Sequence, residues 1–97
     1  MIAQLSVFPL GEGTSVGRFV KKGVAVIEAS GLPYEVGGMS TSVETPDLDT
    51  LFDLIKKVHG AQVAEGAQRV VIDLRVDDRR DIKATIQSKK RSVTGKS

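Results

Sequence analysis

The sequence predicts an α+β domain with the element order β-α-β-β-α-β, in which four antiparallel strands carry two helices on one face. Three observations lead to this prediction. Residues 2–8 and 68–77 alternate as half-buried strands do. Residues 16–30 and 45–66 repeat apolar side chains at helical spacing. Gly37 and Gly38 join two short strand-like runs into a hairpin, so the order strand-helix-strand occurs twice.

The first half of the chain contains a strand, a helix and the hairpin. The strand over residues 2–8 ends at Pro9, and the loop after it offers Thr14 and Ser15 as helix caps. Gly31 is predicted to end the following helix. Residues 32–36 and 39–44 form the hairpin strands. The apolar side of the helix is formed by Val16, Phe19, Val20, Val24 and Ile27.

The second half begins with a helix that Thr45 is predicted to cap, with Pro46 in its first position. Gly66 ends this helix, the strand 68–77 follows, and a short helix with a frayed end is predicted after residue 81. All 97 residues form one domain, in which 82–97 are a basic helix or tail. The predicted core stripe of the second helix consists of Leu48, Leu51, Phe52, Ile55, Val58 and Val63.

The two faces of the predicted sheet differ in character. The helix-covered face takes Leu5, Val7, Val70, Ile72 and Leu74. The open face shows Gln4, Ser6, Phe8, Val71, Asp73 and Arg75. This open face is too apolar for solvent alone and too polar for a core, so we expect it to pack on another subunit or to line a ligand site.

Composition narrows the class of protein. The chain has no cysteine, which excludes disulfides and thiolate chemistry and suits a reducing compartment. No apolar run approaches the roughly 20 residues that span a bilayer, so we expect a cytoplasmic protein without a membrane partner. Residues 82–97 hold five basic and no acidic residues, whereas the rest carries a net charge of −3. The basic tail favours a solvated segment over nucleic-acid binding, because Phe8 is the one aromatic expected on the open strands.

The sequence shows no convincing catalytic or metal centre. His59 is the one histidine and reads as a half-buried structural residue. The loop 11–17 resembles a phosphate-binding turn only weakly, and a flexible turn is favoured. Asp77, Asp78 and Asp81 flank Arg79 and Arg80, which favours an internal salt-bridge corner, or an anion site on the two arginines, over a bound metal. We therefore expect no enzyme activity, no metal and no cofactor.

Polar and polarisable side chains gather on the central hairpin. An aromatic ring, a thioether, hydroxyls and a carboxylate suit a small planar cation through stacking, hydrogen bonds and charge pairing. An ordinary polar hairpin, with Tyr34 packed on the rim of the sheet, is the alternative. The residues are Tyr34, Met39, Ser40, Thr41, Ser42 and Glu44.

The chain resembles the small thiamine-binding protein family, formerly an uncharacterised family with archaeal, bacterial and yeast members. The matching segments are residues 5–11, 32–36, 39–41 with Glu44, 69–71, and 77–81, which reads Asp-Asp-Arg-Arg-Asp. The resemblance implies a ferredoxin-like fold, dimers that form homotetramers through their sheets, and non-catalytic binding of thiamine or its pyrimidine. It implies a ligand site at Ser6, Tyr34, Met39, Thr41 and Glu44.

Two other classes of function compete with thiamine binding. The first is a regulatory or structural oligomeric module that senses an anion or an amino acid through Arg79 and Arg80. The second is an enzyme on the same fold, such as an acyl-phosphate hydrolase. That chemistry needs an arginine in a phosphate-binding loop and an asparagine that places water, but the chain has no asparagine and Arg18 lies past the loop. Fold alone does not separate ligand binding from anion sensing.

Overall fold

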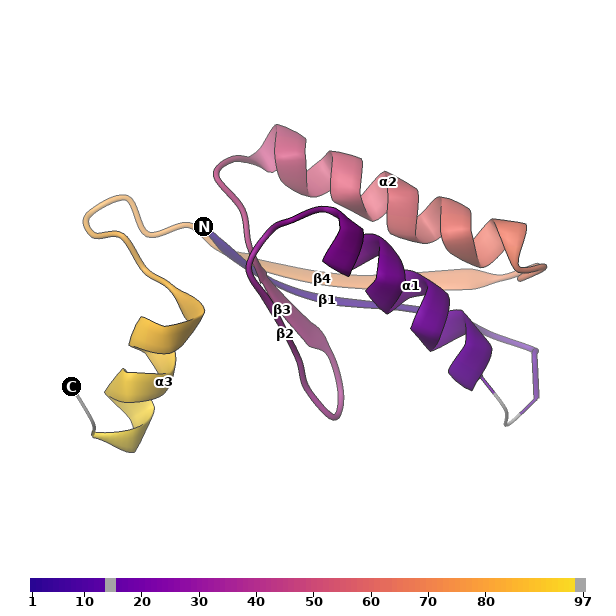
Figure 1. Ribbon diagram of the computed structural model, residues 1–97, viewed down its shortest axis with the longest axis horizontal. Coiled ribbons are helices and arrows are strands. Elements are labelled where there is room, and N and C mark those ends of the chain that lie inside the picture. The colour runs from indigo at the N-terminus through magenta and orange to yellow at the C-terminus, as the bar shows by residue number, and fades with distance from the viewer. Residues whose placement is uncertain (14–15, 96–97) are drawn as a thin grey trace.

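The computed structural model describes residues 1–13 and 16–95. Its elements are β1 (Ile2–Pro9), α1 (Gly17–Ala29), β2 (Tyr34–Val36), β3 (Thr41–Glu44), α2 (Leu48–Ala64), β4 (Val70–Asp77) and α3 (Ile86–Thr94). The four strands form one antiparallel sheet in the order β2-β3-β1-β4, with α1 and α2 side by side across it (Figure 1). The predicted ferredoxin-like α+β fold and the short C-terminal helix are confirmed.

The core lies between the sheet and the two long helices. Alternation along β1 and β3 sends one set of side chains toward the helices. Phe19 is fully buried at the start of α1. The main core cluster consists of Ala3, Leu5, Ile27, Val43, Leu51, Leu54 and Val58.

The helix-covered face is less complete along β4 than predicted. The register pairs Leu5 with Leu74 and Val7 with Ile72, so these residues share the predicted face. Yet Ile72 is 42% exposed and Leu74 37% exposed. The reason is that β4 lies at the edge of the sheet, with a neighbouring strand on one side only. The helix layer therefore covers its side chains only from the side of β1.

Helix α2 differs from its prediction at its start and in its buried face. Asp47, and not Thr45, is the N-cap, and its carboxylate accepts a hydrogen bond from the Thr50 amide at 2.7 Å. Leu48, Phe52 and Val63 of the predicted stripe are exposed. Their places in the helix interface are taken by Leu54 and by Gln62, whose side-chain nitrogen donates to the Phe19 carbonyl of α1 at 2.8 Å.

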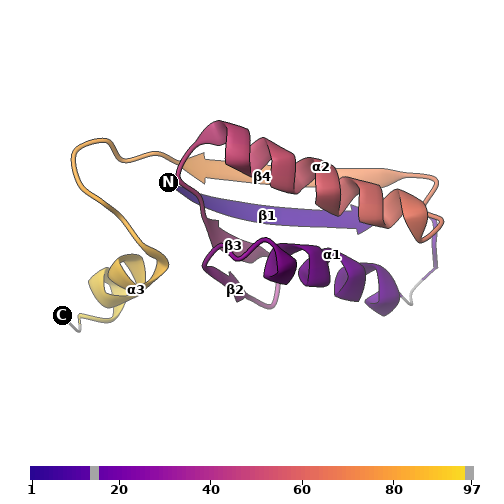
Figure 2. The ribbon, with the colours of Figure 1, turned by 45° about the horizontal axis from the view of Figure 1, so that its top comes forward.

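Helix α1 begins at Gly17 with Val16 at the N-cap and no side-chain cap, while the predicted caps Thr14 and Ser15 lie outside the described residues. Helix α3 lies beyond the end of the sheet, apart from the two-layer body (Figures 1 and 2). It buries none of its residues. Within residues 1–13 and 16–95, no helix is both long and apolar enough to cross a membrane.

Candidate functional site

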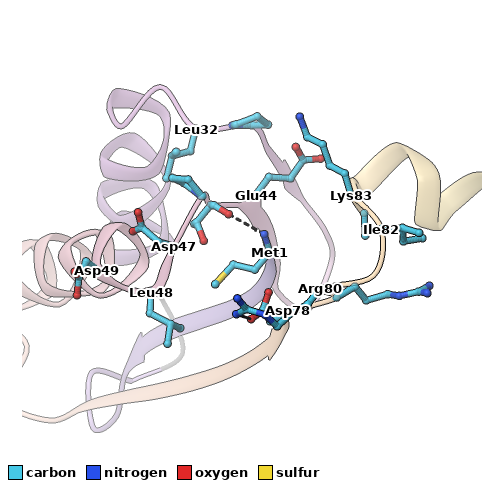
Figure 3. A pocket seen from close by; sticks show the side chains of 15 residues that line it. Met1, Leu32, Glu44, Asp47, Leu48, Asp49, Asp78, Arg80, Ile82 and Lys83 are labelled. Atoms are coloured by element: carbon cyan, nitrogen blue, oxygen red, sulfur yellow. Dashed lines mark hydrogen bonds and ion pairs between the residues drawn. The ribbon is translucent and has the colours of Figure 1, made fainter.

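Two pockets lie near residues that the sequence singled out. The larger, which we call the N-terminal pocket, has a volume of about 880 Å³ and lies where β1 and α2 begin (Figure 3). The α-amino group of Met1 donates to the Thr45 carbonyl at 2.8 Å, and the Thr45 amide returns a bond to the Met1 carbonyl at 2.9 Å. The charged side chains of its lining are Glu44, Asp47, Asp49, Asp78, Arg79, Arg80 and Lys83.

The arginines of the N-terminal pocket are already paired with neighbouring carboxylates. Both ends of the Arg79 guanidinium bond to Asp81, with Nε 3.0 Å from Oδ1. This pairing lowers the pKa of the Asp81 carboxyl and raises the pKa of Arg79. Arg80 lies 3.4 Å from the Asp78 carboxylate. The corner is therefore an internal salt-bridge cluster, and the described residues include no group of three or more His, Cys, Asp or Glu that could hold a metal.

Glu44 holds α3 in place at the edge of the N-terminal pocket. Its Oε1 accepts a hydrogen bond of 2.6 Å from the Ile86 amide, the first residue of α3. This bond between residues 42 apart in the sequence adds to the capping box that Thr85 forms with Ser88. The Glu44 carboxylate therefore already has a structural partner.

The second pocket, which we call the hairpin pocket, is a notch in the sheet with a volume of about 170 Å³. It exists because β1 is longer than its neighbour. Strand β3 pairs with β1 only from Ile2 to Leu5, while β4 follows β1 as far as Pro9. Figure 2 shows β1 and β4 running on past the ends of β2 and β3.

The turn of the hairpin sets the length of β3. Val36 and Thr41 are its last paired residues, so four residues, 37–40, form the tip. The Gly37 amide donates to the Ser40 carbonyl at 2.8 Å and closes this tip. The sequence predicted a tight turn at Gly37 and Gly38 and a third strand that begins at Met39, whereas β3 begins two residues later, at Thr41. The four-residue tip leaves residues 6–8 of β1 without a neighbour on that side.

Helix α1, strand β1 and the hairpin wall the hairpin pocket, with one residue from α2. Helix α1 contributes an apolar side through Val20, Gly23, Val24 and Ile27, with Val58 of α2 behind it. Strand β1 contributes residues 5–8, and the hairpin contributes residues 36–41. The arrangement is one apolar wall opposite a strand edge and a polar turn, which is the usual composition of a small-molecule site.

The polar part of the hairpin pocket comes from hydroxyl groups. Ser6 lies on the open face of the sheet and Thr41, which is buried, on the helix-covered face beside Leu5. Ser40 is held by a 2.9 Å hydrogen bond that the Gln4 side chain donates to its Oγ. Met39, at 91% exposure, stands free at the mouth.

The structure brings together three of the five predicted ligand residues. Ser6, Met39 and Thr41 line the hairpin pocket. Glu44 lines the N-terminal pocket together with Arg79 and Arg80. Tyr34 pairs with Val43 on the edge strand β2 and lines neither pocket. His59 is exposed on α2 and also lines neither, so the half-buried position predicted for it is wrong.

Sequence reasoning missed the α1 wall and the exposed edge of β1. Both follow from the difference in length between β1 and β3. The sequence signal for that difference is a first strand that runs from Ile2 to the proline at position 9, whereas the turn glycines leave few residues for β3 before Pro46.

The fold and the sequence place the chain in one family of small proteins. The sequence model of the thiamine-binding protein family matches residues 3–94, so the chain belongs to that family. It is 38% identical over 95 residues to a UPF0045 protein of Methanothermobacter thermautotrophicus, with 97% of this chain and 96% of the relative covered.

Two solved structures share the fold and a third of the sequence. The hypothetical protein MJ1052 of Methanocaldococcus jannaschii has a TM-score of 0.84 and 35% identity, with 99% of this chain and 96% of that one covered. A domain of unknown function, DUF77, from Bacillus cereus has a TM-score of 0.80 and 34% identity, with coverage of 91% and 84%.

Proposed function

We propose that this chain binds thiamine, or a related small molecule with a pyrimidine ring, in the hairpin pocket, and that it does so as a homo-oligomer without catalysis. The observation that carries the proposal is the ring-sized pocket in a chain of the thiamine-binding protein family. Ser6, Met39 and Thr41 are the side chains that we expect to contact the ligand.

The size of the hairpin pocket favours a single ring. An engineered cavity of about 150 Å³ in another protein binds benzene, and the hairpin pocket measures about 170 Å³. The pyrimidine of thiamine would fill it, and the thiazolium would project past the mouth. There the exposed Met39 thioether can lie against the second ring, since sulfur and aromatic rings attract each other.

The lining of the hairpin pocket favours binding over chemistry. Its described residues include hydroxyls and a thioether but no His, Asp, Glu, Lys or Arg. A serine or threonine needs an adjacent base to act as a nucleophile. The arrangement therefore supports recognition of a ligand and offers no group that would exchange a proton with it.

Two apolar surfaces are alternative sites for self-association. On the open face, Phe8 and Val71 are only partly covered, and they pair across β1 and β4. On the other face, the exposed side of β4 lies along α2, where Phe52 is 46% exposed. An uncovered edge strand beside apolar surface is a common site of pairing between chains. We propose that the open face is the principal interface.

Anion sensing through Arg79 and Arg80 has less support. Both guanidinium groups already bond to carboxylates within the corner. An incoming anion would have to displace Asp81 or Asp78, so the structure favours the thiamine proposal.

Calorimetric titration with thiamine tests the ligand and its pocket together. Thr41→Val keeps the shape of the side chain and removes its hydroxyl, and we expect thiamine affinity to fall by about 2- to 12-fold, the usual net worth of one hydrogen bond. Glu44→Gln is the matched control in the other pocket and should bind like the native chain. No heat with thiamine at millimolar concentration would refute the proposal. Loss of binding in Glu44→Gln alone would move the ligand to the N-terminal pocket.

Light scattering tests the assembly. Val71→Asp places a charge on the open face and should reduce the particle mass, because burying an unpaired carboxylate is costly. Phe52→Asp places the same charge on the α2 surface and should leave the mass unchanged. The reverse result would show that the chains meet through α2 and β4.

A further inference from the structure

The edge of β1 inside the hairpin pocket carries one unpaired main-chain donor and acceptor, and both belong to Val7. Along a strand, successive residues direct their N–H and C=O groups to opposite sides. Met1 exchanges both bonds with Thr45 on the β3 side, and the Leu10 amide donates to Arg69 on the β4 side. The N–H and C=O groups of the odd-numbered residues of β1 therefore point toward β3, and those of the even-numbered residues point toward β4.

This alternation places the Val7 groups at the notch. Leu5, the odd residue before it, pairs with Thr41, the first residue of β3. The same register would set Met39 opposite Val7, but the chain has already turned away in the hairpin tip. Among the described residues, none bonds to the Val7 N–H or C=O across this gap. Val7 also lines the hairpin pocket, so the two groups are open to whatever occupies it.

The gap is too short for another strand. Strand addition uses a run of alternate residues, each with a free N–H and C=O. Leu5 is occupied by β3, and Pro9, the next odd residue, has no N–H to give. A single donor and acceptor from one residue remain, next to an apolar wall the size of one ring.

We propose that the Val7 main chain reads the ligand, and that it selects six-membered rings in which a ring nitrogen lies beside an exocyclic amino group. The ring nitrogen accepts from the Val7 N–H, and the amino group donates to the Val7 C=O, as the facing residue of an antiparallel pair would do. This inference rests on the proposed function and specifies its chemistry. It explains why a binding site can form without a charged side chain.

Nuclear magnetic resonance of the ¹⁵N-labelled chain tests the proposal directly. In the free protein the Val7 amide should exchange with solvent quickly and the Leu5 amide slowly. On titration with 4-amino-2-methylpyrimidine, the Val7 amide proton should shift downfield and become protected at least about fivefold, while Leu5 stays as it was. A Val7 amide as protected as Leu5 in the free chain would overturn the proposal.

The probe 2,4-dimethylpyrimidine is a matched control because a methyl group replaces the amino donor. It would leave the Val7 carbonyl unpaired in the pocket, so we expect affinity about tenfold weaker than for the amino compound. This preference should persist in Thr41→Val. If Thr41→Val abolishes it, the hydroxyl and not the main chain reads the amino group, and the proposal is wrong.

The two proposals fail in different ways. If the aminopyrimidine shifts the pocket resonances but leaves the Val7 amide unprotected, binding stands and main-chain reading is refuted. If neither thiamine nor the aminopyrimidine perturbs any pocket resonance, both are refuted.

Discussion

Replacing Gln62 with methionine should stabilise the protein, although it removes a hydrogen bond. Gln62 is completely buried between α1 and α2, where its Nε2 donates to the Phe19 carbonyl at 2.8 Å. Its Oε1 is buried without a hydrogen-bond partner in the described structure. A buried amide whose nitrogen is hydrogen-bonded and whose oxygen is not loses the hydration of that oxygen without compensation, which destabilises the folded state.

The expected size of the effect follows from these two ends. Losing the bond to Phe19 costs about 1 kcal/mol, and the Phe19 carbonyl keeps its place in the α1 hydrogen-bond ladder. Removing the orphaned oxygen regains about 1–3 kcal/mol of desolvation. Methionine is unbranched like glutamine and adapts to irregular gaps. The net change should be about 1 kcal/mol in favour of folding, which raises Tm by about 4–8 °C in a domain of this size.

Thermal and urea unfolding at fixed protein concentration measure this change, with Gln62→Ala as the control. The alanine variant removes the same polar atoms but opens a cavity, so it should unfold below the native chain. If Gln62→Met is less stable than the native chain by 1 kcal/mol or more, the Oε1 atom has a partner, such as a bound water, and the reasoning is refuted.

Three further predictions concern the hairpin tip and α3. A Cβ at position 37 would lie 3.0 Å from the Ser40 carbonyl oxygen. Gly37→Ala should therefore distort the tip, lower the free energy of unfolding by about 1 kcal/mol and weaken thiamine binding. A Cβ at position 38 meets nothing within 4 Å, so Gly38→Ala should change neither stability nor thiamine binding. Equal calorimetric results for the two variants would contradict this. Glu44→Ala should release α3 and speed proteolysis at Lys83 several-fold, while Glu44→Gln, which keeps an acceptor for the Ile86 amide, should stay close to the native rate. A hydrogen bond from Lys89 lowers the pKa of the Asp77 carboxyl, and one from Arg79 lowers the pKa of the Asp81 carboxyl. These two ion pairs therefore stabilise the folded protein fully above pH 3.8, the ordinary pKa of the carboxyl, and the stabilisation is lost as the pH falls through the lower pKa of the folded state. Acid titration by urea unfolding should show this loss below about pH 4, and it should be smaller in Asp77→Asn; an unchanged acid dependence there would argue against the Lys89 contact.

The fold could be predicted from the sequence because its signals are local. The alternation in residues 2–8 and 68–77, the helical spacing and the turn glycines each define an element over a few residues. The buried face of α2 could not be predicted in the same way. Its apolar residues spread around more than one side, and the interface takes up a glutamine while leaving Phe52 exposed.

The candidate site was predicted in part for a related reason. Residue types pointed to Met39 and Thr41, and the family resemblance added Ser6, but neither gave a sign that Glu44 bonds to α3. The alternative of an ordinary hairpin, with Tyr34 on the rim of the sheet, agrees with the place of Tyr34 on the edge strand β2. Which of these residues line the hairpin pocket depends on where β3 begins relative to β1. A shift of two residues in the turn changes that position. The Val7 main chain carries no signal of its own, because its role comes from a missing neighbour.

Because the hairpin turns over in a four-residue tip, the size of the hairpin pocket depends on how many residues β3 contains. Lengthening β3 by one residue pair would bring a new main-chain partner opposite Val7 and close the notch, while shortening it would expose Leu5 and open a wider one. Ligand range in such a scaffold can therefore change by insertion or deletion in a surface turn, with the core between α1, α2 and the sheet left intact. In protein design, the size of the pocket could be changed stepwise by adding or removing two residues in β3 and its turn.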